Sequence, residues 1–309
     1  MRKGCDRVHE LTEVKADDGV RLCVQHWPAS SDDAPVVLGL HGLSSNRLAF
    51  AALARELAGA AHVVAFDCRG RGRSDHPDDE AAYGMRRHAD DAAAVLSACD
   101  IDAAIVVGQS MGAWIGMQLA AHHPERVRSL VLVDGGWFGP LPASEDPQAF
   151  ADRITGGLLS RLPLVYPSVE LVMGAFRQVP AFAESWDELL DAQLRESLEE
   201  LPDGTCRART SEVGVRSDCD SYFTPRDAPY CNTDASLVRC PVRLLRAERG
   251  FDAGPGTEEP LLPLDAVAGL QAAVPQVAVT TLPGTTHYSI NLGHAGTRAM
   301  AAAVRDAAG

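Results

Sequence analysis

Basic residues are scarce in this chain, and the deficit excludes two kinds of partner. Lys and Arg number 28 against 42 Asp and Glu in 309 residues, so the net charge at pH 7 is −14. Proteins that bind nucleic acid or an anionic membrane surface carry a basic patch. We therefore expect neither partner, and we interpret the negative charge as an acidic, solvated surface that aids solubility.

Long apolar runs and paired-cysteine motifs are also missing. No apolar run reaches the about 18 residues of a membrane span, and Met1–Glu10 lacks the apolar segment of a signal peptide. The eight cysteines include no C-x-x-C pair, and no H-E-x-x-H or phosphate-binding loop motif occurs. We expect a cytoplasmic protein, a monomer or homodimer, that uses neither metal nor cofactor. A local disulfide among Cys206, Cys219, Cys231 and Cys240 stays open.

The chain does contain short apolar strands that alternate with helices. A hairpin with an Asp17-Asp18-Gly19 turn comes first. The elements predicted after it are strand 36–40, helix 47–58, strand 62–66, helix 85–99, strand 103–107, helix 111–121, strand 129–133, and then strand 242–246, helix 264–273, strand 277–282 and helix 296–308. This alternation predicts an α/β fold, with a mostly parallel sheet flanked by helices.

The alternation breaks in the middle of the chain. Residues 137–237 are rich in proline, show no clear strand and contain short amphipathic runs such as 186–198. We interpret this segment as a mainly helical cap inserted into one core. The predicted division is core 1–136, cap 137–237 and core 238–309.

One stretch carries a sequence pattern typical of catalysis. A β-branched apolar run leads into Gly108-Gln109-Ser110-Met111-Gly112, and a helix is predicted to follow. This is the pattern of a nucleophile elbow, a strained strand-to-helix turn that holds the serine hydroxyl above a sheet. Gly108 and Gly112 leave room where strand and helix approach each other closely.

A serine nucleophile needs a histidine base and a carboxylate that orients it. His287 follows the last predicted strand, at the sheet edge where ligands bind, whereas His294 is expected on the surface. Two loops offer the acid. Asp134 ends the strand 129–133, and Asp252 lies in the loop after the strand 242–246, with Glu248 as a weaker third candidate.

The remaining site residues would stabilise charge and line a pocket. We expect the N–H groups of Leu43 and Met111 to form the oxyanion hole. Gly42 lets the backbone approach, and His41 is expected to hold that loop in place. The predicted pocket wall is aromatic and consists of Trp114, Trp137, Phe138 and Tyr288.

Four motifs in one order then point to a family. They are His41-Gly42-Leu43, Asp67-x-Arg69-Gly70-x-Gly72-x-Ser74, Gly108-Gln109-Ser110-Met111-Gly112 and Gly284-x-x-His287. Together they resemble the α/β-hydrolase superfamily over residues 20–136 and 238–309. That superfamily commonly carries its acid after the strand that corresponds to 242–246, where Asp252 stands late. Some members, including lactonases that open the macrolactone zearalenone, carry it one strand earlier, where Asp134 lies, and we therefore prefer Asp134.

The expected reaction is hydrolysis of an apolar carboxylic ester or lactone through an acyl-enzyme. A serine at the elbow argues against epoxide hydrolase or dehalogenase chemistry, which uses Asp there. Carbon–carbon bond hydrolysis and cofactor-free perhydrolysis are alternatives on the same fold, and a ligand-binding homologue without catalysis is a third.

Overall fold

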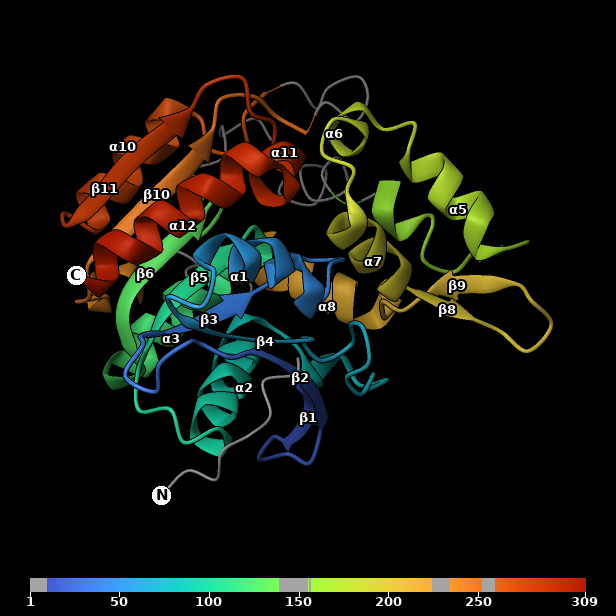
Figure 1. The fold of residues 1–309 in the computed structure, drawn as a ribbon, viewed down its shortest axis with the longest axis horizontal. Helices are drawn as coiled ribbons and strands as arrows, with labels where there is room; N and C mark the ends of the chain where they lie inside the picture. Colours follow the sequence, from blue (N-terminus) through green and yellow to red (C-terminus); the bar gives the residue numbers. More distant parts are fainter. Residues whose placement is uncertain (1–9, 139–154, 156, 224–233, 252–258) are drawn as a thin grey trace.

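An eight-stranded, mostly parallel sheet forms the centre of the computed structural model, which describes residues 10–138, 155, 157–223, 234–251 and 259–309 (Figure 1). The strand order is β1-β2-β4-β3-β5-β6-β10-β11, and only the β1–β2 and β2–β4 pairs are antiparallel. The strands are β1 (Glu10–Lys15), β2 (Arg21–Trp27), β3 (Val36–Leu40), β4 (His62–Phe66), β5 (Ala104–Gln109), β6 (Val127–Val133), β10 (Val242–Ala247) and β11 (Val277–Leu282). The expected α/β architecture is confirmed.

Helices cover both faces of this sheet because its central strands are apolar on both faces. Along β5, Val106 packs into one core cluster while Ile105 and Val107 pack into the other. The first cluster includes residues of α2, α3 and α10, and the second includes residues of α1 and α12. The helices of the core are η1 (Arg47–Phe50), α1 (Ala51–Leu57), η2 (Glu80–Ala82), α2 (Met85–Ala98), α3 (Met111–His122), η3 (Pro124–Arg126), α10 (Leu264–Ala273), α11 (His287–Leu292) and α12 (His294–Ala308).

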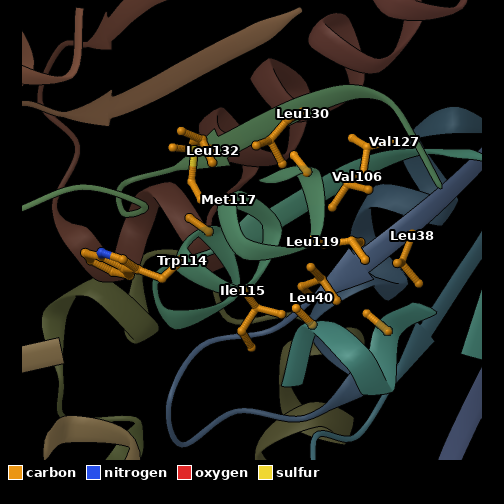
Figure 2. Close-up of a cluster of buried hydrophobic side chains, with 14 of the residues drawn as sticks. Leu38, Leu40, Val106, Trp114, Ile115, Met117, Leu119, Val127, Leu130 and Leu132 are labelled. Atoms are coloured by element: carbon orange, nitrogen blue, oxygen red, sulfur yellow. The ribbon is translucent and has the colours of Figure 1, made fainter. Parts of the chain in front are cut away.

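Helix α3 packs closely on the middle of the sheet. Figure 2 shows its apolar side chains, among them Ile115 and Leu119, beside Leu40 of β3 and Val106 of β5. A Cβ on Gly116 would lie 2.8 Å from a methyl group of Leu130, so the helix approaches the sheet at a glycine. This close packing holds the first residue of α3 in place above the end of β5.

Between β6 and β10, within residues 137–237, the chain adds described elements that do not belong to the central sheet. Figure 1 shows α5, α6, α7, β8 and β9 together on one side of the molecule. The described elements of this stretch are β7 (Val165–Tyr166), α5 (Val169–Phe176), α6 (Pro180–Ala183), α7 (Glu188–Glu196), β8 (Leu198–Glu200), β9 (Cys206–Ala208), α8 (Glu212–Phe223) and η5 (Asp234–Leu237). We call this stretch the inserted segment.

One expectation for the inserted segment is wrong, because it contains strands. Strands β7, β9 and β8 form a small antiparallel sheet. A tight turn joins β8 to β9, where Leu201 N–H donates to the Thr205 carbonyl and Gly204 adopts a φ of 83°. Strands of two or three residues are too short to show an alternating pattern, so the sequence gives no sign of them.

Candidate active site

Ser110 lies at the turn between β5 and α3, in a backbone conformation that few residues adopt. Its φ is 51° and its ψ is −118°. A Cβ on Gly112 would overlap the backbone of Leu40, and one on Gly108 would overlap that of Gly112. The two glycines therefore permit the close strand–helix contact on which the turn depends.

His287 is the first residue of α11 and meets the serine. Its Nε2 lies 3.0 Å from Ser110 Oγ. Thr286 caps the helix in a reciprocal capping box with Ser289, and the His287 N–H donates to the Gly250 carbonyl at 2.9 Å. The backbone of His287 is thus held by hydrogen bonds, which fix the residue independently of the contacts of its imidazole ring.

Asp134 completes a hydrogen-bonded series. It follows β6, is fully buried and lies with Oδ2 2.7 Å from His287 Nδ1. Its Oδ1 accepts the Ala247 N–H at 3.0 Å, and its own N–H donates to Leu245 at 2.8 Å. A carboxylate accepts a hydrogen bond from the Nδ1–H, which leaves Nε2 unprotonated and able to take the hydroxyl proton of Ser110.

Glu248, the third candidate acid, has a different partner from this series. Asp252 lies outside the part of the chain that the structure describes. Glu248 is exposed, and its carboxylate accepts the Gly284 N–H at 2.8 Å, in the loop that leads to His287. The loops after β6 and β11 thus supply Asp134 and His287. The end of β10 and the described part of the loop after it supply backbone contacts to these two residues.

The predicted oxyanion loop lies against the nucleophile. A Cβ on Gly42 would be 3.3 Å from Ser110 Cβ. Within the described residues, no hydrogen bond takes up the N–H of Leu43 or of Met111. Two free donors beside a serine hydroxyl suit the binding of a developing oxyanion.

His41 has the loop-holding contacts expected of it. Its Nε2 accepts the Cys68 N–H at 3.0 Å, and its Nδ1 donates to the Gly42 carbonyl at 2.8 Å. Burial lowers the pKa of His41 to about 3, so the ring is neutral at physiological pH. A neutral ring matches these bonds, since it has one acceptor and one donor nitrogen.

The predicted aromatic residues fall into two groups. Trp114 stacks on Phe138 with ring centroids 4.5 Å apart. Gly135 lies between Trp114 and Ser110, because a Cβ on Gly135 would be 2.8 Å from the Trp114 ring and 2.5 Å from the Ser110 carbonyl oxygen. Trp137 is buried in the core, close to Gly269 of α10. Trp114 and Phe138 thus lie together as expected for one side of a pocket, whereas the Trp137 side chain packs inward against α10.

The second aromatic group includes residues that sequence reasoning missed. Tyr288 has Phe182 of α6 at 5.2 Å and Phe251 at 5.7 Å between ring centroids. Phe251 also lies 4.4 Å from the His287 ring. Its position in the loop after β10, at the carboxyl edge of the sheet, was the available signal for Phe251; nothing in the sequence indicated Phe182.

Two structural searches complete the description. Among the described residues, no group of three or more His, Cys, Asp and Glu side chains is arranged to hold a metal ion. In the same part of the chain, no helix has the length and apolar character needed to cross a membrane.

Comparison with known proteins gives three findings. A family model described as the alpha/beta hydrolase fold matches residues 35–162. The chain is 31% identical over 260 residues to 2-(acetamidomethylene)succinate hydrolase of Mesorhizobium japonicum, covering 82% of each chain. A shorter match, 46% over 78 residues, covers 25% of this chain and 27% of 2-hydroxymuconate semialdehyde hydrolase from a Pseudomonas species.

A solved structure has the same fold over nearly the whole chain. The crystal structure of E-2-(acetamidomethylene)succinate hydrolase superposes with a TM-score of 0.76, at 23% identity, and covers 97% of this chain and 100% of that one. At this identity, the likeness concerns the fold.

Proposed function

Because this chain belongs to the α/β-hydrolase family, we propose that it is a serine hydrolase that cleaves a carboxylic ester or a lactone through an acyl-enzyme. The observation that carries the proposal is the hydrogen-bonded series from Ser110 Oγ through His287 to the buried Asp134. In this assignment Ser110 is the nucleophile, His287 the base and Asp134 the group that orients the base.

In the first half of the reaction Ser110 Oγ attacks the carbonyl carbon of the substrate. His287 Nε2 takes the hydroxyl proton as the bond forms, and Asp134 stabilises the resulting imidazolium without taking its proton. The carbonyl oxygen gains negative charge and binds the N–H groups of Leu43 and Met111. The tetrahedral intermediate then expels the alcohol, which receives the proton from His287, and leaves an ester on Ser110.

In the second half water replaces the alcohol. His287 takes a proton from the water as its oxygen attacks the acyl-enzyme, and a second tetrahedral intermediate forms in the same oxyanion hole. When it collapses, Ser110 regains its proton from His287 and the carboxylic acid leaves. In a lactone the alcohol and the acid are ends of one molecule, so the product is a single hydroxy acid.

The aromatic surroundings support an apolar substrate. The Trp114–Phe138 stack and the group of Tyr288, Phe182 and Phe251 flank the proposed nucleophile and base. Such side chains bind apolar groups of a small molecule and exclude water from the reacting carbonyl. The inserted segment contributes Phe182 and Phe138, and we propose that it acts as a cap that selects the substrate.

Hydrolysis of a carbon–carbon bond is a second candidate, and one observation favours it. The short match at 46% identity is to 2-hydroxymuconate semialdehyde hydrolase, whose name describes a semialdehyde substrate and not an ester. The same serine, histidine and oxyanion donors would serve that reaction. A panel that contains both aryl esters and vinylogous diketones separates the two candidates by comparing kcat/KM.

The proposal is tested by Ser110→Ala in assays with p-nitrophenyl esters and macrolactones. We expect kcat to fall by about 10⁴- to 10⁶-fold, since removing a serine nucleophile leaves only binding and oxyanion stabilisation. Ser97→Ala is the matched control, because Ser97 Oγ donates to Ala93 on α2, before β5 begins. Turnover that persists in Ser110→Ala, or a wild-type protein that binds esters without turnover, would refute the proposal; the latter would indicate a binding protein.

A further inference from the structure

Arg71 is a fully buried cation that contacts both residues of the proposed oxyanion hole. It follows β4 in an arginine-rich turn (Arg69, Arg71 and Arg73), and its side chain has no exposed surface. Its Nε donates to the Leu43 carbonyl at 3.0 Å, and its Nη2 lies 4.0 Å from Met111 Sδ. One planar guanidinium therefore spans the two loops that supply the oxyanion donors.

The charge of Arg71 is balanced by a residue of the inserted segment. Its Nη1 lies 2.6 Å from Asp218 Oδ2, on α8, and Asp218 is fully buried as well. Asp218 also accepts the Gly84 N–H at 2.8 Å and lies 3.0 Å from His88 Nε2. Burial raises the pKa of Asp218, but His88 and Arg71 outweigh it and lower that pKa to about 2.

Backbone contacts of the inserted segment lie around the Arg71–Asp218 pair. Just before α8, its backbone runs along the arginine-rich turn, where Gly72 donates to Arg209 at 2.9 Å and Ser211 donates to Gly70 at 2.7 Å. A Cβ on Gly214 would lie 3.2 Å from Arg71 Nη1 and 2.6 Å from the Tyr83 ring. A glycine at this position of α8 therefore leaves space for the guanidinium.

We infer that Arg71 is a positioning residue for the oxyanion hole, and that Asp218 of the inserted segment sets its position. The inference rests on the proposed function. A buried guanidinium without its carboxylate is strongly unfavourable, so Arg71 would leave its site or recruit water if Asp218 were lost. The Leu43 carbonyl would then lose a charge-assisted bond, and the adjacent donor would lose its fixed direction. Seating of the inserted segment is thereby coupled to catalysis.

The experiment compares Asp218→Asn and Arg71→Lys with the wild type, using p-nitrophenyl butyrate as substrate. Asn keeps the size and the Gly84 bond of Asp218 but removes its charge. We expect kcat to fall by about 10- to 100-fold with KM changed by less than about threefold, as for a small misplacement of catalytic groups. Affinity for a trifluoromethyl ketone, whose adduct with Ser110 places an oxyanion in the hole, should fall by the same factor as kcat/KM.

Glu196→Gln is the matched control. Glu196 of α7 also joins the inserted segment to the core, through Arg47 at 2.8 Å and Arg73 at 2.5 Å, but its ion pairs do not include Arg71. It should lower the midpoint of thermal unfolding without changing kcat. This control separates weakened attachment of the segment from a displaced oxyanion hole.

Three outcomes decide the matter. A loss of kcat and of ketone affinity in Asp218→Asn, absent in Glu196→Gln, supports the inference. Equal kcat in the wild type and both test variants overturns it while the proposed function stands. A wild type that neither hydrolyses the ester nor forms a Ser110 adduct overturns both. Should Arg71→Lys fail to fold, Asp218→Asn alone still gives each of these results.

Discussion

At the residue scale the decisive group is Asp134. Sequence reasoning offered Asp134 and Asp252 because β6 and β10 are neighbours in a parallel sheet, and the loops after both strands reach a histidine that follows β11. The structure gives Asp134 two specific partners, His287 through Oδ2 and Ala247 through Oδ1. The backbone at the end of β10 and just after it also contacts these residues, since the Ala247 N–H donates to the Asp134 carboxylate and the Gly250 carbonyl accepts the His287 N–H.

We predict that Asp134→Asn lowers kcat by about 10⁴-fold, because an amide at this position stabilises the wrong tautomer of the base. The Ser110–His287 geometry should be preserved, so KM should change little. The measurement is steady-state hydrolysis of a p-nitrophenyl ester, with Asp252→Asn as the paired variant. A large loss of kcat in Asp252→Asn alone would transfer the acid role to that residue.

His41 predicts a pH dependence of stability. Its folded-state pKa of about 3 lies below that of a free imidazole. The unfolded chain therefore binds the proton first, and the free energy of unfolding falls as the pH decreases from about 6.5, by up to about 1.4 kcal/mol per unit, until the folded-state pKa is reached. In His41→Gln the free energy of unfolding should be lower at pH 7 than in the wild type, and it should change less with pH between about pH 6.5 and 4.

Chemical denaturation at several pH values measures this slope. His294→Gln is the control, because His294 is exposed and its loss should leave the slope as in the wild type. Asp218 also destabilises the fold on acidification, but only as the pH falls below about 4, since its pKa of about 2 is lower than that of a free carboxyl. Parallel curves for His41→Gln and the wild type would refute the account of His41.

At the scale of elements, the position of Ser110 depends on how closely α3 approaches β3 and β5. Two long-range constraints meet at this turn, one from the backbone of Leu40 beneath Gly112 and one from Gly135, which abuts the Ser110 carbonyl. The elbow was readable in the sequence because glycines must occupy such contacts. The role of Gly135 was less evident, since the contact joins segments that only the sheet order brings together.

Gly112→Ala should destabilise the protein by about 3 kcal/mol or more, because the added methyl would overlap backbone that cannot rotate away. Activity should fall with it as Ser110 moves. Gly174→Ala is the matched control: Gly174 lies in α5 with open space around it, and alanine should stabilise that helix by about 0.5–1 kcal/mol. Urea denaturation measures both, and an unchanged midpoint for Gly112→Ala would contradict the packing argument.

At the scale of the whole molecule, the core was predictable in detail and the inserted segment only in part, since the amphipathic run 186–198 contains α7. Strands such as β3, β4 and β5 carry continuous apolar runs, and most helices between them have clear periodicity, so their positions agree within a few residues with those expected. In the inserted segment, the three short strands give no periodic signal. The sequence does not predict the ion pair between Arg71 and Asp218 either, because that pair depends on how α8 packs on the core.

The central claim is that Ser110 Oγ is the reactive atom. The most direct test is to label the intact protein with a fluorophosphonate and to locate the adduct by peptide mass spectrometry. A serine activated by His287 and an oxyanion hole reacts with such a probe, whereas an ordinary serine does not. The account predicts one adduct, on the peptide that contains Ser110, and its near-complete loss in His287→Gln. Absence of the adduct from the folded wild type, or an adduct on a different serine, would contradict it.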